Sequence, residues 1–129
     1  MRVLLDTHAL LWWLTGDAAL PSTARDLIAD PANEVFVSAA SAWEIATKHR
    51  IGKLPGAGPL AVDFAREIET QGFLPLPISL GHGQDAGALA SSHRDPFDRM
   101  LAAQALTERM VLVSNETAFD ATGVKRVWE

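Results

Sequence analysis

Short, continuously apolar runs alternate along this chain with longer segments in which apolar residues recur at helical spacing. Runs of this length indicate strands that are buried on both faces. Strands are predicted at residues 3–5, 34–38, 110–114 and 125–128. A further extended segment, 73–77, contains two prolines, which place it at a sheet edge or make it a poor strand.

The segments between these runs have the periodicity of amphipathic helices. Helices are predicted at residues 8–14, 22–30, 39–51, 60–71 and 79–90, and from Asp95 to about Arg109. The Gly- and Pro-rich segment 52–59 is predicted to be a loop. No hairpin signal joins any two strands, so the predicted fold class is α/β, with a mostly parallel sheet and helices on both faces.

Composition narrows the class of protein. A chain of 129 residues suits one domain, spanning 1–129, with a real core. The absence of cysteine excludes disulfides and thiolate zinc sites and fits a reducing cytoplasm. The uncharged run from Ala9 to Leu14 is too short to cross a bilayer, so no membrane association is expected. The formal charge of −5 argues against binding nucleic acid by bulk positive charge alone.

Acidic residues lie directly after predicted strands and near the starts of predicted helices. Asp6 comes directly after the first strand, and Glu44 lies in the first turns of the helix after the second. Asp95 and Asp98 open the helix before the third strand, and Glu116 follows that strand. Because ligands bind beyond the carboxyl ends of parallel strands, these acids are predicted to meet at one rim of the sheet.

Ordinary structural roles compete with this interpretation. Asp6 and Asp95 are natural helix caps, and an acid at position 98 complements a helix dipole. Glu116 could simply begin a surface turn. Glu44 could pair with Lys48 at i+4, but its apolar neighbours predict burial, and a lone buried charge is expensive.

Carboxylates that converge on one rim repel one another, and a hard divalent cation relieves that repulsion. Mg²⁺ or Mn²⁺ at such a rim can activate water for phosphodiester hydrolysis. The histidines lack the spacing of a zinc motif. Candidate contacts to a phosphate substrate are His93, Arg94, Arg99 and Lys48.

Several segments together resemble a known family, and they follow its order from one end of the chain to the other. They are 4–8 (LLDTH), 38–44 (SAASAWE), 93–99 (HRDPFDR), 101–104 (LAAQ), 112–114 (LVS), Phe119 and 124–128 (VKRVW). The chain resembles a PIN-domain ribonuclease, specifically a VapC-type toxin of a type II toxin–antitoxin system. That resemblance implies a three-layer α/β/α PIN-like fold and Mg²⁺- or Mn²⁺-dependent endoribonuclease activity.

The resemblance also implies roles for residues and partners. Asp6, Glu44 and Asp98 match the family's metal-binding acids, and Asp95 would support them or cap the helix. Glu116 falls where the family usually has an aspartate, so the resemblance does not decide whether a second metal ion binds. The family implies a homodimer, an RNA substrate, and a cognate VapB-like antitoxin that covers the acidic groove in the cytoplasm.

Two other functions remain as alternatives. A non-catalytic module could keep the PIN-like fold and bind RNA or a protein partner, although binding alone does not require buried carboxylates. A phosphatase of another α/β family is disfavoured, because Asp6-Thr7-His8 lacks the second aspartate that aspartyl-phosphate chemistry needs.

Overall fold

The computed structural model describes residues 1–129 and is built around a five-stranded sheet in the order β3-β2-β1-β4-β5. The strands are β1 (Arg2–Leu5), β2 (Glu34–Ser38), β3 (Leu74–Leu76), β4 (Val111–Val113) and β5 (Arg126–Val127). Every neighbouring pair is parallel, which confirms the predicted parallel sheet. The proline-containing β3 lies at one edge and pairs with β2 alone, so its missing backbone donor is tolerated.

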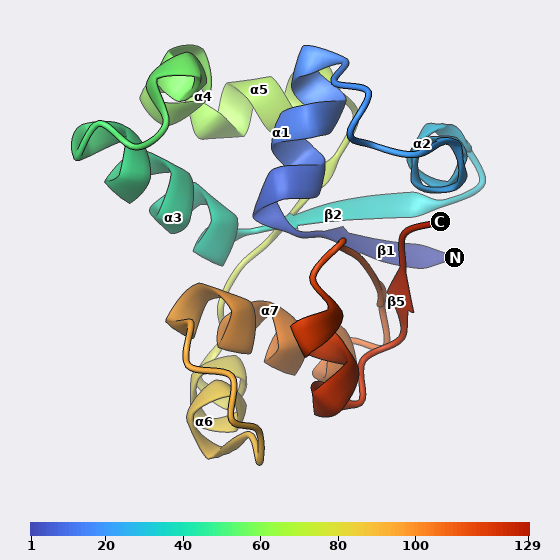
Figure 1. Cartoon of the computed structure of the whole chain (residues 1–129), viewed down its shortest axis with the longest axis vertical. Coiled ribbons are helices and arrows are strands. Elements are labelled where there is room, and N and C mark those ends of the chain that lie inside the picture. The colour runs from blue at the N-terminus through green and yellow to red at the C-terminus, as the bar shows by residue number, and fades with distance from the viewer.

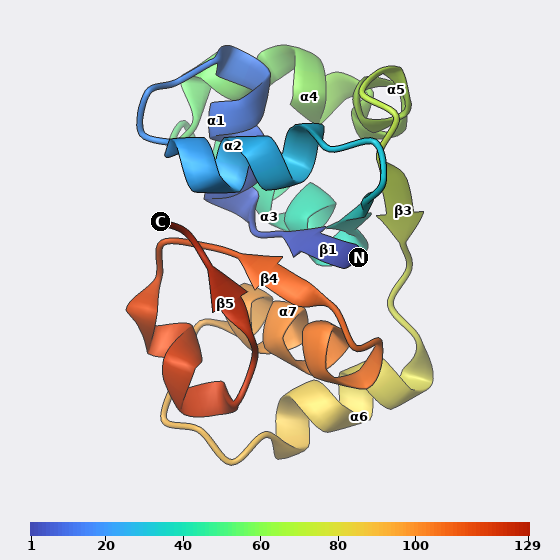
Figure 2. The same cartoon turned by 90° about the vertical axis from the view of Figure 1, so that its right-hand side faces the viewer.

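Helices cover both faces of the sheet, as the strand–helix alternation predicts (Figures 1 and 2). One face carries α1 (Thr7–Thr15), α2 (Ser22–Ala29), α3 (Ala39–Arg50), α4 (Gly58–Val62) and α5 (Phe64–Thr70). The opposite face carries α6 (Leu80–Ala88), α7 (Pro96–Thr107) and the 3₁₀ segment η2 (Thr117–Thr122). No helix is long and apolar enough to span a membrane.

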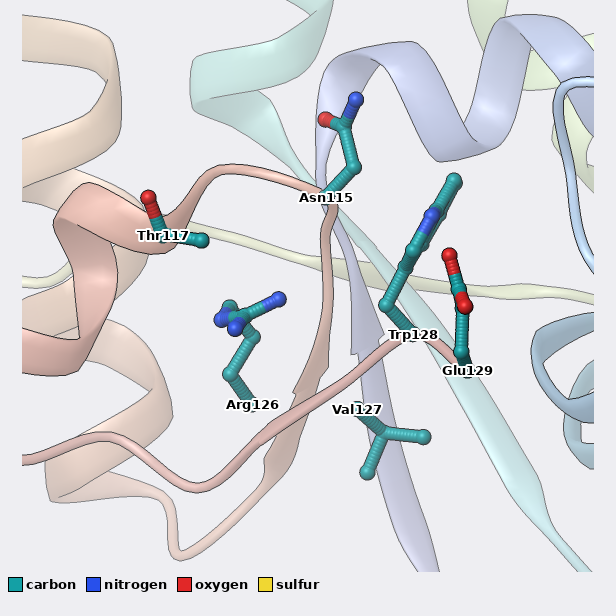
Figure 3. A pocket seen from close by; sticks show the side chains of 6 residues that line it. All are labelled: Asn115, Thr117, Arg126, Val127, Trp128 and Glu129. Atoms are coloured by element: carbon teal, nitrogen blue, oxygen red, sulfur yellow. The ribbon is translucent and has the colours of Figure 1, made fainter.

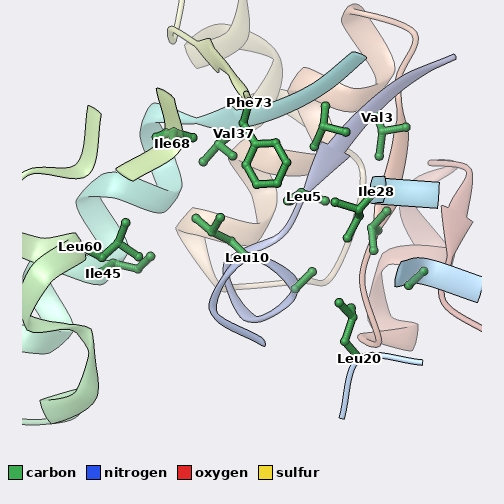
Figure 4. Close-up of a cluster of buried hydrophobic side chains, with 14 of the residues drawn as sticks. Val3, Leu5, Leu10, Leu20, Ile28, Val37, Ile45, Leu60, Ile68 and Phe73 are labelled. Atoms are coloured by element: carbon green, nitrogen blue, oxygen red, sulfur yellow. The ribbon is translucent and has the colours of Figure 1, made fainter. Parts of the chain in front are cut away.

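The core consists of two apolar clusters, one on each face of the sheet. Strand side chains alternate between faces, so Val3 and Leu5 of β1 join the first cluster while Leu4 joins the second. In the first cluster, shown in Figure 4, β1 and β2 side chains pack against Leu10 of α1 and Ile45 of α3. This packing fixes α1 and α3, the two helices that follow β1 and β2.

One predicted helix is divided in two. The segment 60–71 forms α4 and α5 instead of one helix, because Asp63 leaves the helical conformation, with φ −143°. Its carboxylate then accepts a hydrogen bond from the Arg66 N–H at 3.2 Å and caps α5. Local bonding by a short acidic side chain thus competes with helix continuation. A short 3₁₀ turn, η1 (Pro55–Ala57), also lies within the predicted loop.

Three strands deliver polar residues to one rim of the sheet. Asp6 follows β1, and its N–H bonds the Val113 carbonyl of β4 at 3.1 Å, which extends the β1–β4 ladder by one residue. Ser38 ends β2 and caps α3, accepting a hydrogen bond from Ala40 N–H at 2.9 Å. Ser114 follows β4 and is fully buried. The carboxyl ends of β1, β2 and β4 therefore lie side by side.

Candidate active site

All five acids singled out in the sequence line a single cavity at this rim. The cavity has a volume of about 210 Å³, and none of its lining residues is hydrophobic. Its lining residues are Asp6, Thr7, His8, Glu44, Lys48, His93, Asp95, Asp98 and Glu116. Residues that are more than a hundred positions apart in sequence thus meet at one place, as the strand topology predicts.

Asp6 is held at the base of the cavity by the start of α1. Its carboxylate caps the helix, accepting a hydrogen bond from Ala9 N–H at 2.8 Å, and the residue is only 4% exposed. Burial raises the pKa of Asp6, against the lowering effects of the Ser114 hydroxyl and the Ala9 N–H. Asp6 therefore both caps α1 and belongs to the acid cluster.

Glu44 reaches the cavity from the first turns of α3 and is 4% exposed, as its apolar neighbours predict. Thr7 Oγ1 donates a hydrogen bond of 2.6 Å to Glu44 Oε1, while Lys48 forms a close ion pair with Oε2. Burial opposes the charged form of Lys48, but Glu44 and the nearby carboxylates of Asp95 and Asp98 raise its pKa overall. The i+4 pair therefore forms inside the cavity rather than at the surface.

Thr7 is a site residue that the sequence analysis missed. It is 5% exposed, and its hydroxyl lies between Glu44 and Ser41, 3.1 Å from the Ser41 hydroxyl. The sequence feature that could have indicated Thr7 is its position directly after Asp6, at the end of a buried strand.

Asp98 lies against His93 near the mouth of the cavity. His93 Nε2 is 3.0 Å from Asp98 Oδ2, and the side chains are 15% and 18% exposed. This contact lacks good hydrogen-bond geometry, so the buried Nε2 atom has no hydrogen-bond partner. Burial, followed by the charge of Asp95, raises the pKa of Asp98 to about 7. A carboxyl in that range changes its charge near neutral pH.

Asp95 caps the helix that carries Asp98. Its Oδ1 accepts hydrogen bonds from Phe97 N–H at 2.9 Å and Asp98 N–H at 3.3 Å. Pro96 occupies the first turn, where its missing donor costs nothing. This start of α7 aims Asp98 at the cavity, so Asp95 both lines the site and fixes the orientation of its neighbour.

Two of the predicted substrate contacts do not line the cavity. The Arg99 guanidinium donates hydrogen bonds to five main-chain carbonyls in the segment 86–93, including those of Ala86 at 3.0 Å and His93 at 2.9 Å. Because the Arg99 N–H groups already bond main-chain carbonyls, Arg99 fixes the segment that presents His93. Arg94 is exposed and also lies outside the lining. Lys48 and His93 are the candidate contacts that the structure brings to the acids.

The donor set suits a hard divalent cation. Carboxylate oxygens are the ligands that Mg²⁺ and Mn²⁺ prefer. Burial, with a further contribution from neighbouring carboxylates, raises the pKa of Asp6 and of Asp98, and a bound cation would favour their charged forms. In the present conformation no three acidic or histidine side chains are grouped tightly enough to hold a metal ion. Lys48 and His93 contact two of the acids instead.

Comparison with known proteins identifies the family. The sequence matches the PIN domain family over residues 3–125, and the chain therefore belongs to that family. It is 38% identical over 69 residues to Ribonuclease VapC16 of Mycobacterium tuberculosis, a match covering 54% of this chain and 48% of the relative's length.

Solved structures share the fold at low sequence identity. One is VapBC2 from Rickettsia felis bound to a DNA fragment from their promoter, with a TM-score of 0.70, 16% identity and complete coverage of both chains. Another is VapBC-1 from nontypeable Haemophilus influenzae, with a TM-score of 0.69 and 16% identity, covering 98% of this chain and 97% of that one. The three-layer α/β/α PIN-like arrangement predicted from the sequence is thereby confirmed.

Proposed function

We propose that this chain, acting as one domain over residues 1–129, is a metal-dependent endoribonuclease and the toxin of a toxin–antitoxin pair. The observation that carries the proposal is the cavity at the carboxyl ends of β1, β2 and β4, which is lined by five acids and by no hydrophobic residue. Membership of the PIN domain family supports it, as does similarity to a protein named Ribonuclease VapC16.

In this proposal Asp6, Glu44 and Asp98 hold Mg²⁺ or Mn²⁺, with Glu116 as a fourth oxygen donor. The bound ion supplies an activated water and stabilises charge on the phosphate. Thr7 fixes the rotamer of Glu44 through its 2.6 Å hydrogen bond. No covalent nucleophile is required, since water attacks the phosphodiester directly.

Two of the three basic side chains in the cavity, Lys48 and His93, have roles that follow from their positions. Lys48 pairs with Glu44, and the His93 ring contacts Asp98, in the metal-free chain. The Lys48 ammonium would be free to contact a phosphate oxygen if a cation were bound beside Glu44. His93 would likewise be free to hydrogen-bond the leaving oxygen.

The proposed partner is a VapB-like antitoxin, and the proposed assembly contains a homodimer of this chain in the cytoplasm. The structural neighbours come from VapBC toxin–antitoxin complexes. A cavity lined by five acids, one lysine and two histidines is a natural receptor for a basic side chain from such a partner. Insertion of that side chain would exclude the metal and stop cleavage.

The ion pairs inside the cavity favour one alternative function. Because Lys48 and His93 already contact two of the acids without metal, the chain could act as a non-catalytic PIN module that binds RNA or a protein. Such a module would bind without turnover, whether or not Mn²⁺ is present.

Induced expression in bacteria separates the two functions. Wild type is compared with Asp98→Asn and with Asp26→Asn, a matched change at an exposed aspartate on α2. The nuclease proposal predicts growth arrest and discrete new RNA ends for wild type and Asp26→Asn but not for Asp98→Asn. Equal arrest by all three proteins, without new ends, would support the binding module instead.

A further inference from the structure

A second, larger cavity lies beside the acidic one, where β4 and β5 end. Its volume is about 600 Å³, and its lining is shown in Figure 3. The lining residues are Asn115, Thr117, Arg126, Val127, Trp128 and Glu129. The reaction proposed above uses none of these side chains.

The two cavities are neighbours through the backbone and through a run of rings. Asn115 lines the larger cavity and the next residue, Glu116, lines the acidic one. His8 of the acidic cavity lies 5.4 Å from the Trp12 ring, and Trp12 lies 5.7 Å from Trp128 of the larger cavity. Because the two linings meet at residues 115 and 116, a chain bound at the acids can extend into the larger cavity.

The charges of the larger cavity argue against a phosphate ligand. Arg126 is its cation, and that guanidinium bonds Asp120 at 2.8 and 3.2 Å and the Ser114 carbonyl at 3.1 Å. Glu129 adds a negative charge at the rim. With its cation paired and an acid exposed, this cavity is suited to an uncharged polar group.

A nucleobase is an uncharged polar group of the kind that this cavity suits. The half-buried Trp128 ring offers a face for stacking, which accepts any base. The exposed Asn115 amide offers both donors and an acceptor to a base edge. We infer that the larger cavity binds the base of a single-stranded RNA nucleotide flanking the one whose phosphate lies at the acids. This inference rests on the proposed ribonuclease function and adds to it a subsite that selects unpaired RNA.

The test uses the whole chain and a single-stranded 2′-O-methyl RNA of about eight nucleotides, within the usual range of single-strand sites. Binding is measured by fluorescence anisotropy with Ca²⁺, a hard cation that also binds carboxylate oxygens, and the RNA is recovered afterwards to verify that it is uncleaved. The variants are Trp128→Leu, Trp128→Phe and Trp13→Leu. Trp13 is the control because it also packs on the first core cluster but contacts Phe73 and Gln71, away from both cavities.

Loss of stacking should weaken binding by Trp128→Leu about tenfold, while Trp128→Phe keeps most of the affinity. Trp13→Leu should bind within about twofold of wild type, since Trp13 lines neither cavity. Replacing one base of the RNA with an abasic nucleotide should weaken wild type similarly and leave Trp128→Leu unaffected. Binding by Trp128→Leu equal to wild type, or an equal loss in Trp13→Leu, would overturn the subsite.

A parallel cleavage assay with unmodified RNA and Mn²⁺ keeps the two proposals apart. Base-dependent binding at Trp128 without cleavage would support the base subsite and contradict the nuclease proposal. Cleavage that is indifferent to Trp128→Leu would sustain the nuclease and remove the subsite. Failure of wild type both to bind and to cleave single-stranded RNA would remove both.

Discussion

Ser38 Oγ donates a 2.5 Å hydrogen bond to Gln104 Oε1, and both residues are fully buried. Ser38 caps α3, which carries Glu44, while Gln104 lies in α7, which carries Asp98. The Gln104 amide nitrogen also contacts the Pro77 carbonyl at 3.3 Å. One side chain thus joins the two helices that bring acids to the cavity from different parts of the chain.

Gln104→Leu tests this link. The change keeps the side chain's approximate volume but leaves the Ser38 hydroxyl without its acceptor, which costs about 1–3 kcal/mol. We expect the free energy of unfolding in urea to fall by that amount and RNA cleavage to fall further than stability alone explains. Leu106→Gln, at an exposed position on the same helix, is the control and should change stability by less than about 0.5 kcal/mol. Wild-type stability in Gln104→Leu would contradict the link.

Lys48→Met tests the competition between the internal ammonium and a metal ion. Lys48 is 33% exposed, so screening reduces the cost of stranding Glu44 to about 1–2 kcal/mol in EDTA. Mn²⁺ should then raise the melting temperature of Lys48→Met more than that of wild type, because no ammonium has to leave.

The exposed Lys53 supplies the matched control. Lys53→Met should respond to EDTA and Mn²⁺ as wild type does, which calorimetry can establish. Identical shifts with Mn²⁺ in Lys48→Met and wild type would show that Glu44 takes no part in metal binding.

Asp98→Asn tests the origin of pH-dependent stability in the metal-free chain. Burial and then Asp95 raise the pKa of Asp98 from 3.8 to about 7. The folded chain therefore holds a proton that the unfolded chain has lost, and wild type should lose stability as pH rises from about 4 through about 7. Asn cannot ionise, so above pH 7 the variant should be more stable by up to about 4 kcal/mol.

Denaturant titration in EDTA across this pH range provides the measurement. Asp6, whose pKa is also raised by burial, should keep part of the slope in the variant. Asp26→Asn on α2 should follow the wild-type curve. Parallel curves for wild type and Asp98→Asn would mean that Asp98 titrates as an ordinary surface acid.

Arg99→Lys tests whether the Arg99 guanidinium fixes the segment 86–93, which presents His93. A lysine cannot reach the five carbonyls that the guanidinium bonds, so stability should fall by about 2–3 kcal/mol. Amide hydrogen exchange should increase within residues 86–93. The exposed Arg94→Lys should leave exchange unchanged, and an equal effect of the two changes would contradict this role for Arg99.

The sheet and the meeting of the acids were predictable because both follow from local patterns. Buried apolar runs without hairpin signals require parallel strands, and parallel strands put Asp6 and Glu116 at one rim. Capping chemistry also placed Asp95 at the start of a helix. These signals lie within a few residues of the side chains they position.

The internal contacts of the site were not predictable from the sequence. Arg99 was assigned to substrate because a basic residue beside acids suggests phosphate, yet its partners are carbonyls that only the fold brings near. The Thr7–Glu44 and Ser38–Gln104 bonds join residues 37 and 66 positions apart. No local pattern specifies such partners, because they depend on how the helices pack.

Cleavage of a defined single-stranded RNA by the purified chain tests the central claim most directly. Wild type, Asp98→Asn and Asp26→Asn are assayed with Mn²⁺ and with EDTA, and the products are mapped. The account predicts discrete cuts by wild type and Asp26→Asn with Mn²⁺ alone, and at least about a hundredfold less cleavage by Asp98→Asn. Cleavage that persists in EDTA, or that Asp98→Asn retains in full, would contradict a metal-dependent nuclease at the acidic cavity.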